Sequence, residues 1–138
     1  MENGQRTLVV DDDVFIGSRM ELMLNLLGIT DVTRAVNGLQ AVELFGQALK
    51  AGKPYSLVFL DIIMPEMDGQ EALKRIRTME REAGVSGTDR SIIIMTTSLG
   101  SPNDMMEAMF EGDCNDYIVK PVDEAILGGM LTRYGLIM

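Results

Sequence analysis

Several charged residues in this chain directly follow short apolar runs. Asp11, Asp12 and Asp13 come after one such run, Asp61 after a second, and Lys120 after a third. Clustered carboxylates offer the hard oxygen ligands that Mg²⁺ prefers, and a lysine beside them would bind a phosphoryl group. A lone aspartate at the end of a strand can instead cap a helix or form a turn. The interpretation as a metal and phosphate site therefore requires that these residues meet in the fold.

The elements that must position these residues are predicted to alternate between strands and helices. The apolar run 57–60 follows Pro54 and is typical of a strand buried on both faces. The first two helical segments end at Gly28 and Gly52. The expected strands are residues 7–10, 29–36 (a more polar edge strand), 57–60, 92–95 and 117–119, and the expected helices are residues 14–27, 39–51, 70–82, 103–111 and 123–134.

Strict alternation of strands and helices predicts an α/β fold. It is a doubly wound, five-stranded parallel sheet with helices on both faces and right-handed crossovers. Such sheets bind ligands at the carboxyl ends of their strands, where the charged residues are expected. We expect one domain over residues 1–138, with residues 1–6 as a loose tail. Because only residues 135–138 follow the last helix, we expect no output domain.

Composition excludes several classes of function. The net charge of −9 argues against nucleic-acid binding, which relies on lysine and arginine. The absence of histidine excludes a histidine-based catalytic triad, a histidine-ligated metal and a phosphohistidine carrier. A single cysteine, Cys114, fits a reducing compartment. No apolar run approaches the roughly 20 residues that span a bilayer. We therefore expect a cytoplasmic protein that binds neither membrane nor nucleic acid.

In combination, these motifs resemble the receiver domain of two-component response regulators, in its stand-alone, chemotaxis-regulator-like form. The matching features are the acidic pair Asp11-Asp12, the stretch DIIMPEMDG that begins at Asp61, a threonine before a small residue after the fourth strand, and Lys120-Pro121. The resemblance covers nearly the whole chain in the same order. It implies the strand order 2-1-3-4-5.

The resemblance also implies the roles of the site residues. Asp61 would accept a phosphoryl group from the phosphohistidine of a histidine kinase or histidine phosphotransfer protein. Magnesium would be bound by Asp12 directly, by Asp11 through water, by Asp61 and by the backbone carbonyl of Ile63. Asp13 is better explained as a helix cap. Such a protein catalyses only its own phosphorylation and dephosphorylation.

By the same resemblance, further residues would transmit the signal. Lys120 would bind the phosphoryl group after a cis peptide bond to Pro121. Thr97, with Thr96 as the alternative, would be the hydroxyl partner. Tyr117 would be the rotating aromatic residue, and the face formed by helix 4, strand 5 and helix 5 would bind an unidentified downstream protein. The side chains of Ile63 and Leu99 would shield the phosphoryl group from water.

One feature departs from the family pattern, and other functions stay open. The family has a glycine shortly before the fifth strand, whereas this chain has Gly112 followed by Asp113. If Asp113 takes the glycine position, it needs a left-handed backbone conformation. Alternative functions are a phosphorelay intermediate, a receiver-shaped module that takes no phosphate, or a magnesium phosphohydrolase with an aspartyl nucleophile, since Asp11 and Asp13 form a DxD motif.

Overall fold

The computed structural model describes residues 5–98 and 102–137. It contains a five-stranded parallel sheet in the order β2-β1-β3-β4-β5, as predicted. The strands are β1 (Thr7–Val10), β2 (Val32–Ala35), β3 (Leu57–Asp61), β4 (Ile92–Thr97) and β5 (Asp116–Val119). The helices are α1 (Val14–Leu26), α2 (Gly38–Lys50), α3 (Gly69–Glu82), α4 (Pro102–Met106) and α5 (Glu124–Arg133), with a 3-10 turn at Gly87–Asp89.

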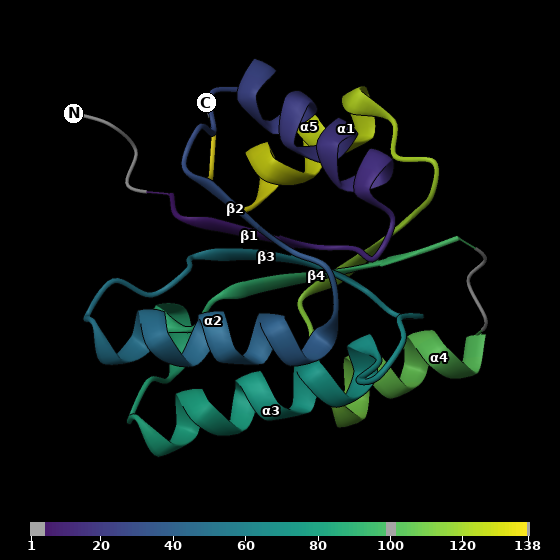
Figure 1. Cartoon of the computed structure of the whole chain (residues 1–138). Coiled ribbons are helices and arrows are strands. Elements are labelled where there is room, and N and C mark those ends of the chain that lie inside the picture. The colour runs from purple at the N-terminus through teal and green to yellow at the C-terminus, as the bar shows by residue number, and fades with distance from the viewer. Residues whose placement is uncertain (1–4, 99–101, 138) are drawn as a thin grey trace.

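The helices form a layer on each face of the sheet, with α1 and α5 on one face and α2, α3 and α4 on the other (Figure 1). Alternation along the strands divides the core between these layers. Val9 and Phe59 pack with the apolar side chains of α1 and α5. Val10 and Leu60, one position further along the same strands, pack toward α2 and α3. Within residues 5–98 and 102–137, no helix is long and apolar enough to cross a membrane.

The largest difference from the expected elements is in the predicted helix 103–111. It is divided into α4 and a π-helical turn at Glu107–Glu111, where the Gly112 amide donates to the Glu107 carbonyl over 2.9 Å. A π turn accommodates one additional residue in a helix. Asp113 follows with φ 67°, so it adopts the left-handed conformation anticipated for it. The position of Gly112 would not accept an aspartate in its place, since a Cβ added there would lie 2.4 Å from Leu73 Cδ2.

The remaining boundaries agree closely with expectation. Strand β4 extends to Thr97, two residues further than predicted, and β2 is limited to Val32–Ala35. Helix α1 begins where the Asp13 carboxylate accepts hydrogen bonds from the amides of Phe15 and Ile16, which confirms Asp13 as its cap. Leu99 lies outside the described residues.

A close approach of backbone to backbone fixes the loop after β3. The Gly69 amide donates to the Ile62 carbonyl over 2.8 Å. A Cβ on Gly69 would lie 2.1 Å from the Asp61 carbonyl oxygen, and one on Gly38 would lie 2.3 Å from the Met67 carbonyl oxygen. Only glycine permits these approaches. The start of α3 is thereby held directly against the end of β3.

Candidate functional site

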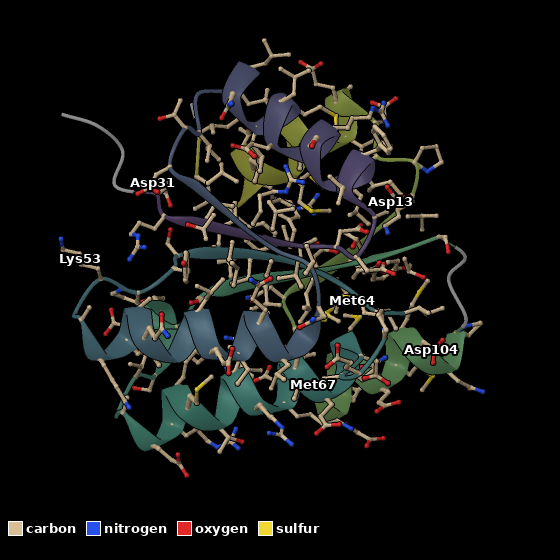
Figure 2. All side chains as sticks on the ribbon, viewed as in Figure 1. Asp13, Asp31, Lys53, Met64, Met67 and Asp104 are labelled. Carbon is tan, nitrogen blue, oxygen red and sulfur yellow. The ribbon has the colours of Figure 1, made fainter. Side chains whose placement is uncertain are left out.

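The charged residues selected from the sequence meet at the carboxyl edge of the sheet. Figure 2 shows Asp13 and Met64 near this edge, whereas Asp31 and Lys53 lie at the opposite edge. One carboxylate oxygen from each of Asp11, Asp12 and Asp61 lies within 4.8 Å of the others. Strands β1 and β3 are neighbours in the sheet, so their ends bring these residues together. The structure thus joins two widely separated parts of the sequence in one acidic cluster.

Lys120 extends from the end of β5 into the same cluster. The bond between Lys120 and Pro121 is cis, as the resemblance implied. The Lys120 ammonium lies 2.7 Å from Asp11 Oδ2 and 3.1 Å from Asp61 Oδ2. The three side chains are only 12%, 5% and 8% exposed, respectively. A single cation therefore bridges two buried carboxylates that would otherwise repel each other.

This environment changes the proton affinity of Asp61 and Lys120. Burial raises the pKa of Asp61 above its usual value, and the neighbouring Asp11 carboxylate adds to this, while Lys120 and the Ile63 amide oppose it. Burial also lowers the pKa of Lys120, but its hydrogen bonds and charge contacts with Asp11 and Asp61 outweigh that effect and raise it overall. The ammonium is therefore the stable form of Lys120, and it favours the ionised form of Asp61.

The donor set of the cluster is suited to a hard divalent cation. Three carboxylates converge without competing histidine or cysteine in the cluster, and carboxylate oxygens are the ligands that Mg²⁺ prefers. Asp11 and Asp61 are buried, while Asp12 is exposed and accessible from solvent. The cluster could therefore hold a metal ion. The Ile63 amide lies 3.4 Å from Asp61 Oδ1, which places the loop containing Ile63 beside the phosphoacceptor candidate.

The two candidate threonines lie on opposite faces of the sheet. Thr96 pairs with Asp61 in register and lines a small space together with Asp11 and Lys120. Thr97 follows on the other face, in line with Met95, which packs in the same cluster as Tyr117. Both threonines are buried. Thr97 thus shares its face of the sheet with Tyr117 and α4. The roles of Thr96, Thr97 and Tyr117 stay predictions.

A buried polar network around Arg77 was not predicted. The guanidinium contacts Glu80 Oε1 at 2.7 Å, the Ser91 carbonyl at 2.9 Å and Asn115 Oδ1 at 2.8 Å. Both Arg77 and Glu80 are almost fully buried. A signal was present in the sequence, because Arg77 and Glu80 continue the helical spacing of the buried Leu73 and Ile76. Two opposite charges three residues apart on an apolar helix face indicate a buried ion pair.

Comparison with known proteins identifies the family. The response regulator receiver domain family matches residues 7–132. Over 116 residues the chain is 38% identical to the chemotaxis protein CheY of Bacillus subtilis, covering 84% of this chain and 85% of that protein. The chain therefore belongs to the response regulator receiver domain family, the signalling module of two-component systems.

Longer relatives and solved structures agree. The DNA-binding dual master transcriptional regulator RpaA of Synechocystis sp. is 33% identical over 118 residues, with 86% of this chain and 44% of RpaA covered. The chain thus spans less than half the length of that relative. A co-crystal structure from Saccharomyces cerevisiae contains the histidine phosphotransfer signaling protein Ypd1 and the receiver domain of its downstream response regulator Ssk1. Its match has a TM-score of 0.80 and 30% identity, and it covers 95% of this chain and 88% of that chain.

Proposed function

We propose that this protein is a phosphorylation-controlled switch in which Asp61 accepts a phosphoryl group from a phosphohistidine. The observation that carries the proposal is the position of Asp61, in a cluster of three carboxylates and 3.1 Å from the Lys120 ammonium. Family membership supports the same function. Asp11, Asp12 and Asp61, with the Ile63 carbonyl, would hold Mg²⁺, which when bound neutralises charge on phosphoryl oxygens.

The chemistry of the chain's own residues follows from this arrangement. An oxygen of the ionised Asp61 carboxylate attacks phosphorus, and the bond from phosphorus to the donor's imidazole nitrogen breaks. The electron pair stays on that nitrogen, so the products are an aspartyl phosphate and the donor's unphosphorylated imidazole. Lys120 exchanges its contact with Asp61 for one with a phosphoryl oxygen and stabilises the transferred charge. In this scheme the protein catalyses only its own phosphorylation and dephosphorylation, at Asp61.

The donor would be a histidine kinase or a histidine phosphotransfer protein. The solved complex of Ypd1 with the Ssk1 receiver domain supports a donor of this kind. An apolar patch lies next to the acidic cluster, since Val14, Phe15 and Ile16 begin α1 directly after Asp13 and are 57%, 86% and 37% exposed. A donor that buries this patch would bring its phosphohistidine to the end of the sheet that carries Asp61.

The response would appear on the face formed by α4, β5 and α5. Thr97 would approach the phosphoryl group and Tyr117 would turn inward, which changes this face. Apolar side chains are available there for a downstream protein, because Met106, Phe110 and Val119 are 58%, 78% and 46% exposed. A phosphoryl group can shift the equilibrium only toward arrangements that it contacts more favourably.

Intact-mass measurement tests the central step. Incubation with Mg²⁺ and acetyl phosphate should add the mass of one phosphoryl group to the wild-type protein and none to Asp61→Asn. Asp31→Asn, at the opposite edge of the sheet, is the matched control and should be labelled like the wild type. Equal labelling of Asp61→Asn would refute the assignment.

The same preparation tests the phosphohydrolase alternative. A phosphohydrolase of the DxD type needs Asp13 as well as Asp11, but the Asp13 carboxylate is occupied as the cap of α1. We therefore expect no turnover of free phosphate esters.

A relay intermediate would instead return the phosphoryl group from Asp61 to a second histidine-containing protein, which radiolabel transfer would detect.

A further inference from the structure

Helix α3 extends three long polar side chains toward the segment that contains α4. They are spaced at i, i+4 and i+7, so they form one stripe along the helix. We call Gln70, Lys74 and Arg77 the α3 ladder. Figure 1 shows α3 and α4 together in the layer below the sheet. The contacts are Gln70 Nε2 to the Asp104 carbonyl at 2.7 Å, Lys74 Nζ to Glu107 Oε2 at 2.7 Å, and Arg77 Nε to the Asp113 carbonyl at 2.8 Å.

Arg77, the ladder residue nearest the C-terminus of α3, makes the most contacts. Arg77 also binds Glu80, the Ser91 carbonyl and Asn115, so it joins α3 to the beginnings of β4 and β5. Breaking a buried charge pair of this kind is strongly destabilising. This end of the ladder is therefore held by more contacts, and more deeply buried ones, than the Lys74–Glu107 pair.

The end of the ladder nearer the N-terminus of α3, at Gln70 and Lys74, lies along a surface groove. A solvent-open groove of about 550 Å³ lies between the loop after Asp61 and the segment that contains α4, and Ile62, Ile63 and Met64 line its side nearest Asp61. Gln70 and Lys74 line the same groove. Gln70 contacts the Asp104 carbonyl in α4, and Lys74 contacts Glu107 in the π turn that follows α4. Polar contacts from α3 therefore hold α4 and the π turn on the side of this groove that faces away from the Asp61 loop.

The chemistry of Gln70 indicates that it is more than a packing residue. The side chain is 7% exposed, and its Oε1 has no hydrogen-bond partner among the described residues. A buried, unsatisfied carbonyl lowers stability, and an apolar side chain of similar size would avoid that cost. The favourable contact of the amide is its bond to the Asp104 carbonyl in α4.

We propose that the N-terminal part of the α3 ladder, Gln70 and Lys74, holds α4 and the π turn that follows it in their unphosphorylated position and so sets the threshold of the switch. The proposal rests on the function assigned to Asp61. If α4 must leave this position when Asp61 is phosphorylated, the two contacts oppose activation. Removing either one then favours the activated arrangement, and by linkage it strengthens binding of any ligand specific to that arrangement.

Beryllium fluoride, a phosphoryl mimic, is the probe, titrated by calorimetry in saturating Mg²⁺ against Gln70→Leu and Lys74→Met. Gln70→Leu should bind it about fivefold more tightly than wild type, the factor for one hydrogen bond of ordinary strength. Lys74→Met should show a smaller gain, since the Lys74–Glu107 pair is 43% and 35% exposed. Lys74→Arg keeps the charge and should restore wild-type affinity.

The controls separate the ladder from stability and from the proposed function. Arg75→Met removes a neighbouring cation that pairs with Glu71 on α3 itself, so its affinity should equal that of wild type. Gln70→Leu should unfold at the same or a higher temperature, whereas a merely structural role predicts lower stability and weaker binding together. Unchanged or weaker binding in Gln70→Leu would overturn the ladder proposal alone. A wild-type protein that does not bind beryllium fluoride would overturn the proposed function itself.

Discussion

Replacing Lys120 by methionine should expose the electrostatic cost of the acidic cluster. Methionine keeps the length of the side chain and removes only the ammonium. In the metal-free protein, Asp11 and Asp61 then lose the cation at 2.7 and 3.1 Å that compensates their charges. We expect the variant to fold but to be clearly less stable than wild type at pH 7.

The magnitude follows from distance and burial. At an effective dielectric constant of about 20, the two contacts correspond to about 6 and 5 kcal/mol of Coulomb energy. Desolvation of the ammonium offsets much of this, and removal of one partner from a buried pair costs about 3–5 kcal/mol in practice. A loss of about 3 kcal/mol lowers the midpoint of thermal unfolding by roughly 10 °C for a domain of this size.

The loss should depend on pH in a defined direction. Burial raises the pKa of Asp61 and Lys120 opposes the rise, so the pKa rises further in the variant. A carboxyl group whose folded-state pKa is raised binds more protons folded than unfolded, and stability falls as pH rises through that pKa. The difference from wild type should therefore be largest at pH 7 and shrink as pH falls toward the ordinary value of 3.8.

Thermal unfolding by far-UV circular dichroism, with EDTA and then with Mg²⁺ across this pH range, measures the effect. Mg²⁺ should reduce the difference from wild type, because a bound cation replaces the lost charge and lysine is no metal ligand. Lys53→Met is the control, since Lys53 is exposed at the opposite edge of the sheet. A difference that grows on acidification, or an equal effect of Lys53→Met, would refute this account of Lys120.

Two further predictions concern the loop after β3. Ile63 is 70% exposed beside Asp61, so Ile63→Asn should admit a water to the phosphoryl group and speed its hydrolysis several-fold, while Ile63→Val should not. Loss of the phosphoryl mass over time measures this, and equal rates in both variants would contradict the shielding role. Gly69→Ala should cost about 3 kcal/mol in urea unfolding, because its Cβ would overlap the Asp61 carbonyl. Gly129→Ala has open space and should be neutral or stabilising, so similar losses in both alanine variants would contradict the argument from contact.

The fold and the acidic cluster could be predicted because both depend on local patterns. A short apolar run that ends in a charged residue identifies a buried strand and the edge at which it ends. Parallel strands end at a common edge, so Asp11, Asp61 and Lys120 were expected at the same edge of the sheet, and the strand order decides how close they lie. The strand order came from the family resemblance, and the structure confirms it.

The remaining features depend on contacts between distant segments. The sequence does not specify that Lys120 binds Asp11 more closely than Asp61, because that depends on how β5 ends relative to β1. The π turn at Glu107–Glu111 accommodates a residue whose position along helix 103–111 no local pattern identifies. Gln70 and Lys74 have the composition of an ordinary exposed helix turn, and their partners come from α4 and the π turn, which lie far away in the sequence.

The last two residues of β4, Thr96 and Thr97, lie on opposite faces of the sheet. Asp61 and Thr96 lie on the face of α1, whereas Thr97 and Tyr117 lie on the face of α4. The Thr96 carbonyl accepts the Ile62 amide over 3.1 Å, and the next carbonyl, of Thr97, accepts the Lys120 amide over 2.7 Å. Two successive peptide groups of β4 therefore bind the residue that follows Asp61, and Lys120 itself. A shift of Lys120 toward a phosphoryl group on Asp61 would act on the backbone of Thr97 directly, and its side chain would carry the change to the face that α4 covers.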